Sequence, residues 1–333
     1  MTIIPEGYES RLSLYDTQRA VERIKYIFLA KLCTALHLVR VTAPLVVDPT
    51  TGMNDNLSGV ERPVSFDVLA TGKNAEVVQS LAKWKRYALR RYDFNMGKGL
   101  VCDMNAIRRD ETLDNLHSIY VDQWDWEKVI CEEDRTLEYL QDVVSRIVTA
   151  ICDTLDELKW HYPQLDVELD RKVTFVSAQE LEDLYPELAP QERERCFVAD
   201  HHTTFIIGIG GALRSGRPHD SRSPDYDDWD LNGDLLFWDD VLGCALEASS
   251  MGIRVSPASL DQQLTIAGCD DRRKLPFHKM LLEGELPYTI GGGIGQSRLC
   301  MLLLGKAHVG EVQASVWDGE TVRTCQASGV QLL

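Results

Sequence analysis

Apolar residues recur at helical spacing in two long stretches of the chain. A helix that begins near Ser13 is predicted by apolar residues three or four positions apart, at Val21, Ile24, Phe28, Leu32 and Leu36. The same spacing of leucine, valine and isoleucine predicts a long helix over residues 137–158. Shorter helices are predicted at 80–91, 257–267 and 272–282, and within 178–194. Other structure must therefore fill the segments between them.

These intervening segments are short, rich in β-formers and bounded by polar turns. Strands are predicted at residues 64–69, 76–78, 101–108, 118–126, 173–176, 205–209, 234–238 and 245–255. Residues 38–47 are also β-rich, but Pro44 favours an edge strand there, because proline cannot donate to a sheet. The charged stretch 214–230 is expected to be a loop over a site.

The order of these elements predicts an α+β fold rather than a doubly wound one. Strands joined by hairpins, with helices scattered between them, favour a mainly antiparallel mixed sheet flanked by helices. The chain shows no repeat, linker or break in composition, so we expect a single domain over residues 1–333.

The overall charge and the cysteines narrow the classes of function. The chain has 52 acidic and 35 basic residues and a net charge of −17, which repels nucleic-acid phosphates, so no nucleic-acid partner is expected. Its nine cysteines include no CxxC pair, which favours reduced thiols and a cytoplasmic location. The first residues lack a signal-peptide pattern, and no apolar run is long enough to span a bilayer, so no membrane association is expected.

A glycine-rich segment near the C-terminus stands out as a candidate binding element. Residues 289–298 read Thr-Ile-Gly-Gly-Gly-Ile-Gly-Gln-Ser-Arg, followed by an apolar helix that ends near Gly305. Glycine lets the backbone lie against a ligand, and Arg298 could hold a phosphate with two parallel hydrogen bonds. The pattern is neither a P-loop nor a dinucleotide fingerprint, and a tight turn that feeds a buried helix explains it equally well.

Other basic side chains are candidates to bind anions in this acidic protein. Arg108 ends a predicted strand, Arg254 ends another, and Lys85 lies in a basic cluster with Lys83 and Arg86. The alternative for each of them is a solvated surface charge.

Several acids are placed where they could hold a cation. Asp234 and Glu247 fall on consecutive predicted strands, where facing carboxylates would suit Mg²⁺. Gln123 and Asp125 share one face of a strand, and Asp55 lies in an early polar loop. The alternative for each acid is a turn or a loop cap.

The histidines and nucleophiles offer less. The neighbouring His201 and His202, and also His219, lack a third metal ligand at a useful spacing. No GxSxG or Cys/His arrangement indicates covalent catalysis.

Taken together, these segments resemble a known family. The first helix, the strand with Pro44, the strand that ends in Arg108 and the glycine run that ends in Arg298 resemble the three motifs of the class II aminoacyl-tRNA synthetase core. The chain more closely resembles the ammonia-dependent asparagine synthetases, or aspartate–ammonia ligases, in residues 55–59, 80–86, 120–127, 223–229, 231–234, 249–254 and 289–298. It differs from a bacterial form of that family at Gln79, where a histidine is expected, and in a shorter loop after Trp229.

The resemblance implies a two-step reaction that uses ATP and Mg²⁺. The β-carboxylate of L-aspartate would attack ATP to form a β-aspartyl-adenylate and pyrophosphate, and ammonia would then displace AMP to give L-asparagine. The residue after Met1 is Thr2 rather than a cysteine nucleophile, which fits ammonia as the nitrogen source. The resemblance also implies a homodimer, joined through the first helix and the Pro44 strand.

The resemblance also implies roles for individual residues. Arg108, Arg298, Gly293, Gly295 and Ser249 would bind ATP, with Asp234 and Glu247 on Mg²⁺. Lys85 and Gln123 would polarise the side-chain carbonyl of the substrate, and Asp55 would attract ammonium and take its proton. The remaining substrate-binding residues would be Asp125 and Asp227 for its ammonium group, Ser250 and Arg254 for its α-carboxylate, and Ser80 in the same pocket.

Two other readings of the sequence stay open. A tRNA-charging enzyme would need an anticodon-binding module and a basic face, and neither is visible. A catalytically silent amino-acid sensor would not need all of the charged positions, including Arg108 and Arg298, that the chain retains.

Overall fold

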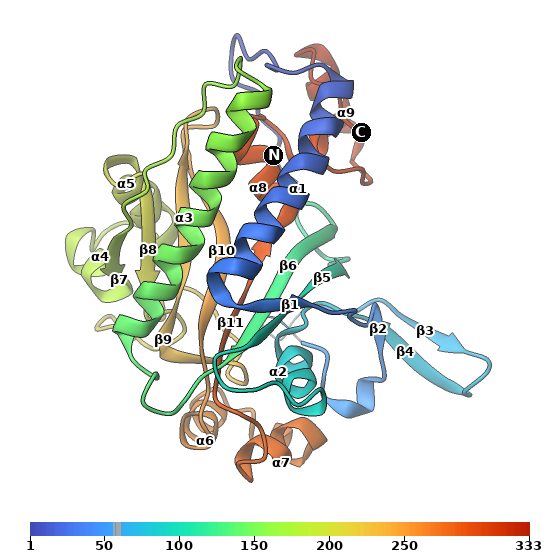
Figure 1. Ribbon diagram of the computed structural model, residues 1–333, viewed down its shortest axis with the longest axis vertical. Helices are drawn as coiled ribbons and strands as arrows, with labels where there is room; N and C mark the ends of the chain where they lie inside the picture. The colour runs from blue at the N-terminus through green and yellow to red at the C-terminus, as the bar shows by residue number, and fades with distance from the viewer. Residues whose placement is uncertain (56, 58–60) are drawn as a thin grey trace.

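A large twisted sheet forms the centre of the protein. The computed structural model describes residues 1–55, 57 and 61–333 (Figure 1). Within these residues the main sheet has eight strands, in the order β1 (Leu38–Arg40), β5 (Gly99–Ile107), β6 (Tyr120–Val129), β11 (Thr289–Gly295), β10 (Cys244–Arg254), β9 (Asp227–Asp239), β8 (Thr203–Ile207) and β7 (Thr174–Ser177). The two outermost pairs are parallel and the inner pairs are antiparallel, so the predicted mainly antiparallel mixed sheet is confirmed.

Two long helices cover one face of this sheet. α1 (Leu14–Leu36) and α3 (Leu137–His161) lie side by side across it (Figure 1). Each helix begins at a hydroxyl cap, where Ser13 accepts from the Asp16 amide and Thr136 accepts from the Tyr139 amide. The apolar stripe of α1 packs into the core, and the rings of Phe28 and Trp124 lie 4.8 Å apart. Both long helices predicted from the apolar spacing are therefore confirmed.

The remaining helices lie around the edges and ends of the sheet (Figure 1). α4 (Ala178–Leu184) and α5 (Pro190–Asp200) pack near β7, β9 and β10, while α2 (Ala82–Arg91) packs against β6. The other helical segments are α6 (Pro257–Ile266), η2 (Asp270–Lys274), α7 (Pro276–Leu282), α8 (Gln296–Leu303), η3 (Val309–Glu311) and α9 (Gly319–Ala327). No helix among the described residues is both long and apolar enough to cross a bilayer.

A small second sheet projects to one side of the molecule (Figure 1). Its strands are β2 (Val46–Val47), β4 (Lys73–Val77) and β3 (Ser65–Val68), in that order, and η1 (Pro49–Thr51) follows β2. The β-rich segment 38–47 is thus divided between the two sheets, with β1 at an edge of the large one, and Pro44 lies between the two strands rather than within one.

The glycine run is a central strand of the main sheet rather than a turn. β11 lies between β6 and β10. A Cβ at Gly291 would lie 2.7 Å from the Trp126 carbonyl oxygen, and one at Gly292 would lie 2.5 Å from the Met251 Cβ. The glycines are therefore required by close packing against the neighbouring strands.

Two further boundaries differ from the sequence prediction. β9 begins at Asp227, inside the stretch 214–230 that was expected to be a loop. The helix after the glycines ends at Leu303, as expected, but it is not the last one, because α9 follows it. Only Thr321 and Cys325 of α9 are buried, so its sequence carries little apolar periodicity.

Candidate active site

A cleft of about 450 Å³ opens above β10 and β11. Its walls come from the end of β5, from β6, from the segment before β9 and from the start of α8. The predicted site residues that line it are Arg108, Gln123, Glu247, Ser249, Ser250, Gly293, Gly295 and Arg298. The cleft therefore brings together residues that lie as much as 190 positions apart in the sequence.

Two arginines, Arg108 and Arg298, line the cleft and act on the Glu247 carboxylate. Arg298 NH1 donates to the Glu247 carbonyl oxygen at 3.1 Å and lies 3.5 Å from the Glu247 carboxylate. The Nε of Arg108 is buried and has no partner among the described residues. Burial opposes the ionisation of Glu247, but Arg298, Arg222 and Arg108 outweigh it and lower the pKa of its carboxyl group. This part of the cleft can therefore hold an anion beside fixed cations.

A β-bulge places the side chains of Asp234, Glu247 and Ser250 on one face of the sheet, and two of them, Glu247 and Ser250, line the cleft. Asp234 pairs with Ser250 across the β9–β10 ladder, and Glu247 pairs with Leu236. The register shifts between Glu247 and Ser249, so Ala248 is the extra residue. Without that shift, Glu247 and Ser250 would point to opposite faces of the sheet. The two candidate metal ligands are thus not directly opposite one another, but they share a face.

Asp234 carries an unsatisfied acceptor. Arg222 pairs with its Oδ2, while its Oδ1 is buried without a hydrogen-bond partner in the part of the chain that the structure describes. Burial raises the pKa of Asp234 to about 7; Glu247 adds to this shift and Arg222 opposes it. A carboxylate in this position is stabilised by a cation that enters the cleft.

A buried ion-pair network lies beneath the cleft. Lys85 reaches from α2 to pair with Asp125, and it donates to the Gly292 carbonyl oxygen at 2.9 Å. Arg254 pairs with Asp227 and lies 3.2 Å from Glu127. The Glu127 carboxylate also accepts from the Thr289 hydroxyl at 2.8 Å.

The predicted substrate-binding residues in this network contact one another rather than open space. Lys85, Asp125, Asp227 and Arg254 are nearly inaccessible to solvent. One acceptor remains, because Asp125 Oδ2 is buried with no partner among the described residues. The network can therefore receive one more donor without breaking a contact.

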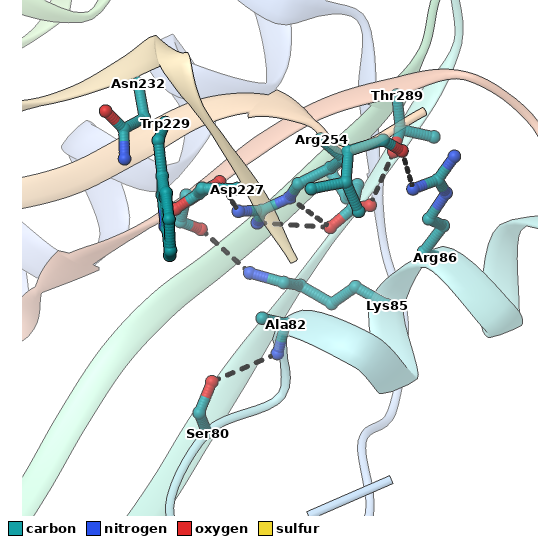
Figure 2. Close-up of polar contacts among 12 residues, drawn as sticks. Ser80, Ala82, Lys85, Arg86, Asp227, Trp229, Asn232, Arg254 and Thr289 are labelled. Atoms are coloured by element: carbon teal, nitrogen blue, oxygen red, sulfur yellow. Dashed lines mark hydrogen bonds and ion pairs between the residues drawn. The ribbon is translucent and has the colours of Figure 1, made fainter. Parts of the chain in front are cut away.

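Ser80 lies just before this network. Its hydroxyl accepts from the Ala82 amide at 3.2 Å and caps the turn that leads into α2 (Figure 2). This contact orients the segment from which Lys85 extends.

Asp55 is a buried carboxylate with no partner among the described residues. Only 1% of the residue is exposed, and neither carboxylate oxygen has a hydrogen-bond partner among the described residues. Gln79 packs beside it and donates to its carbonyl oxygen at 3.4 Å. Burial raises the pKa of Asp55 to about 6, against the opposing charge of Lys83. Residues 56 and 58–59 of the same motif lie outside the described residues.

The raised pKa of Asp55 predicts that this side chain lowers the stability of the fold above pH 6. The pKa of the Asp55 carboxyl group is about 6 in the folded protein, above the ordinary value of 3.8, so folding favours its protonated form. The contribution of this protonated group to the stability of the fold is therefore complete below pH 3.8 and is lost as the pH rises through 6. We expect Asp55→Asn to raise the free energy of unfolding by about 2–3 kcal/mol at pH 8 and to change it little near pH 4. Urea unfolding at both pH values measures this, and equal effects at the two would contradict it.

Several functional candidates were missed in the sequence. Arg222 lines the cleft and pairs with Asp234, and Glu127 completes the pairing of Arg254. Asp225 is fully buried among cations. The charged stretch 214–230 signalled a loop over a site, but the sequence does not indicate which of its charges turn inward.

Comparison with known proteins agrees with this geometry. A family model described as aspartate-ammonia ligase matches residues 15–329. A protein of Clostridium perfringens named aspartate–ammonia ligase is 56% identical over 331 residues, which cover 99% of this chain and 98% of that protein. One of Lactobacillus johnsonii with the same name is 56% identical over 333 residues, 99% of each chain.

Solved structures show the same fold at low sequence identity. The asparaginyl-tRNA synthetase of Entamoeba histolytica in complex with asparaginyl-adenylate superposes with a TM-score of 0.65 at 14% identity, over 90% of this chain and 66% of that one. The Pyrococcus horikoshii enzyme with the same adenylate gives 0.65 at 15% identity, over 91% of this chain and 70% of that one. The expected class II synthetase-like fold is confirmed.

Proposed function

The chain belongs to the aspartate–ammonia ligase family, and we propose that its cleft converts L-aspartate, ammonia and ATP into L-asparagine, AMP and pyrophosphate. The observation that carries this proposal is that Arg108 and Arg298 line one cleft, while Asp234 and Asp125 pair with the cleft residues Ser250 and Gly293 and each keep a buried carboxylate oxygen without a partner among the described residues. The β-carboxylate of aspartate attacks the α-phosphorus of ATP and releases pyrophosphate. Ammonia then attacks the acyl carbon of the β-aspartyl-adenylate, and AMP leaves.

The part of the cleft with the two arginines is the proposed ATP site. Two anions must approach each other in the first step, and fixed cations offset their repulsion most strongly as charge develops. Arg108 and Arg298 would hold the phosphates, while Gly293 and Gly295 let the nucleotide lie close to β11. Ser249 donates to the Gly293 carbonyl oxygen at 2.8 Å and so fixes this floor.

Asp234 and Glu247 fit a Mg²⁺ site. Mg²⁺ is commonly held by one or two carboxylates together with phosphate oxygens and water. The bulge brings both side chains to one face, and the buried Oδ1 of Asp234 is free to bind. The ion would supply positive charge at the phosphates of ATP.

The network beneath the cleft is the proposed aspartate site. The free Oδ2 of Asp125, with Asp227, would accept from the substrate ammonium group. Ser250 and Arg254 would donate to its α-carboxylate, beside Ser80. Gln123 lines the cleft and would polarise the β-carbonyl with Lys85, whose ammonium group already lies against β11.

We further propose a homodimer without a nucleic-acid partner, in which the whole chain forms one catalytic domain of a cytoplasmic enzyme. Large apolar side chains are exposed on α1 and beyond it, at Leu14, Tyr15, Tyr26, Val39, Leu45 and Val46. Contact with a second copy of the chain would cover these exposed apolar side chains. Sedimentation of dilute protein is expected to give a dimer, and a monomer would contradict the proposed interface.

Product analysis tests the proposed reaction. Incubation with aspartate, Mg-ATP and ammonium is expected to yield equal amounts of asparagine, AMP and pyrophosphate, and omission of Mg²⁺ should stop all three. Formation of ADP, or ATP cleavage that does not depend on aspartate, would reject the proposal. Charging of tRNA with aspartate or asparagine would indicate a synthetase, whereas binding of aspartate without AMP release would indicate a sensor.

A further inference from the structure

Asp225 forms the centre of a buried charge cluster behind Asp55. One carboxylate oxygen of Asp225 lies 2.9 Å from Arg272, 2.9 Å from His278 and 3.5 Å from the Lys83 ammonium group. Its other oxygen accepts from the Ser223 hydroxyl at 2.7 Å. The side chains of Asp225 and His278 are fully buried, and that of Lys83 is almost fully buried.

The two acids of this region, Asp225 and Asp55, differ in the contacts that their carboxylates make. Asp225 contacts two cations and a histidine, while Asp55 has no hydrogen-bond partner among the described residues. Both acids nevertheless feel the same charges, since Lys83 and Arg272 lower the pKa of Asp55 and Asp225 raises it. The charged or titratable groups that act on Asp55, or on which it acts, are Lys83 of α2, Asp225 and Tyr226 before β9, Arg272 of η2, and Arg108 at the end of β5.

The charges of the cluster balance only if both acids are ionised. Lys83 and Arg272 carry two positive charges, and ionised Asp55 and Asp225 carry two negative ones. An ammonium ion that enters beside Asp55 therefore meets a carboxylate with no partner among the described residues, next to two cations whose charge Asp225 helps to offset. If Asp225 lost its charge, the same ion would meet a cluster that is already positive, in a region of low dielectric where repulsion is strong.

We propose that Asp225 is a positioning residue for the ammonia step, which holds Lys83 and Arg272 so that the Asp55 carboxylate stays unpaired and open to ammonium. This inference rests on the proposed function. The lysine side chain is a flexible four-carbon stem with a compact charge, so Lys83 can turn from one carboxylate to the other. Without the Asp225 charge, Lys83 would pair with Asp55 and compete with ammonium for the same two oxygens.

The variant Asp225→Asn tests this role, because it keeps the size of the side chain and removes its charge. We expect its KM for ammonium to rise roughly 10- to 100-fold, since an opposite charge within reach of a carboxylate shifts its proton affinity by about 1–3 pKa units. Aspartate-dependent ATP/pyrophosphate exchange should stay within about twofold of wild type. The acid limb of the pH profile for asparagine formation should move to lower pH.

The double variant Asp225→Asn/Lys83→Met separates positioning from a general loss of structure. Removal of the competing ammonium group should restore most of the affinity for ammonium. Glu182→Gln is the matched control, since it removes the charge of a buried acid that lies 3.6 Å from Arg193 at the other edge of the sheet. It should leave the KM for ammonium unchanged.

Three results would overturn the proposal. They are an unchanged KM for ammonium in folded Asp225→Asn, an equal loss of exchange and synthesis, and a failure of Lys83→Met to rescue. If Asp225→Asn does not fold, the single variant Lys83→Met is decisive. It should lower the KM for ammonium and move the acid limb of the pH profile to higher pH. No change in either quantity would reject the proposal. A wild-type protein that makes no asparagine would instead reject the proposed function.

Discussion

Replacement of Arg298 by alanine is expected to raise the barrier to adenylate formation by about 2–5 kcal/mol, by analogy with the cost of truncating one partner of a buried charge pair. Arg298 is 24% exposed, and its guanidinium group lies 3.5 Å from the Glu247 carboxylate. Its loss removes a cation from the phosphates and leaves Glu247 facing them with less compensation. The rate constant for ATP/pyrophosphate exchange measures the effect directly.

Two further variants make the Arg298 experiment specific. Arg298→Lys keeps the charge but loses the planar fork, so its loss of rate should be intermediate. Arg91→Ala removes an exposed arginine at the end of α2 and should have no effect. An unchanged rate in folded Arg298→Ala, checked by its melting temperature, would show that this side chain does not contact the phosphates.

Much of the fold could be predicted because local patterns determine it. The stripes of α1 and α3 repeat every three or four residues, and hydroxyl caps begin both helices. The strand pairs β5–β6 and β9–β10 follow one another in sequence, so hairpin patterning was sufficient to find them. Elements that are determined by residues close together in the sequence can therefore be predicted from the sequence alone.

The glycine run shows where local patterns fail. Three adjacent glycines have low β-propensity and suggest a turn. In the structure they form a central strand, because Trp126 and Met251 on the neighbouring strands leave no room for a Cβ. That requirement arises from segments some 40 to 165 residues away, so it has no signature within the run itself.

The same limit applies to the site. Residue types indicated that Asp234 and Glu247 could hold a cation, but the bulge at Ala248 that gives them one face depends on strand register. Similarly, Arg254 was predicted to contact substrate, but the sequence did not indicate its pairing with Asp227 and Glu127, which joins three separate strands. The resemblance to a family indicated which residues belong to the site. Only the packed structure shows which charged partners compensate the charge of each of them.

A protein with a net charge of −17 can bind anions only if cations are fixed where they are needed. Here two arginines of the cleft are held by carboxylates, Arg222 by Asp234 and Arg298 by Glu247. Pairing keeps the cations in place before ATP arrives, so little reorganisation is needed during the reaction. Asp55 differs from these paired carboxylates, because it forms no ion pair with a cation among the described residues.

Because of this difference, Asp55→Ala is expected to separate the two half-reactions. Ammonium has no lone pair, so it must lose a proton before it can attack, and Asp55 is the buried base with free oxygens. Proton transfer of this kind contributes roughly 10²–10⁴ in rate, so asparagine formation should fall by about that factor. ATP/pyrophosphate exchange precedes ammonia attack and should persist.

Single-turnover measurements on the preformed adenylate can test this division. Asp55→Asn should behave like Asp55→Ala, because it keeps the shape of the side chain but cannot accept the proton. Higher pH should partly restore both variants, since free ammonia then enters without the need for a base. If exchange and synthesis fell together, or if alkaline pH gave no recovery, Asp55 would instead be required for the shape of the site, and the proton acceptor would have to be sought elsewhere in the cleft.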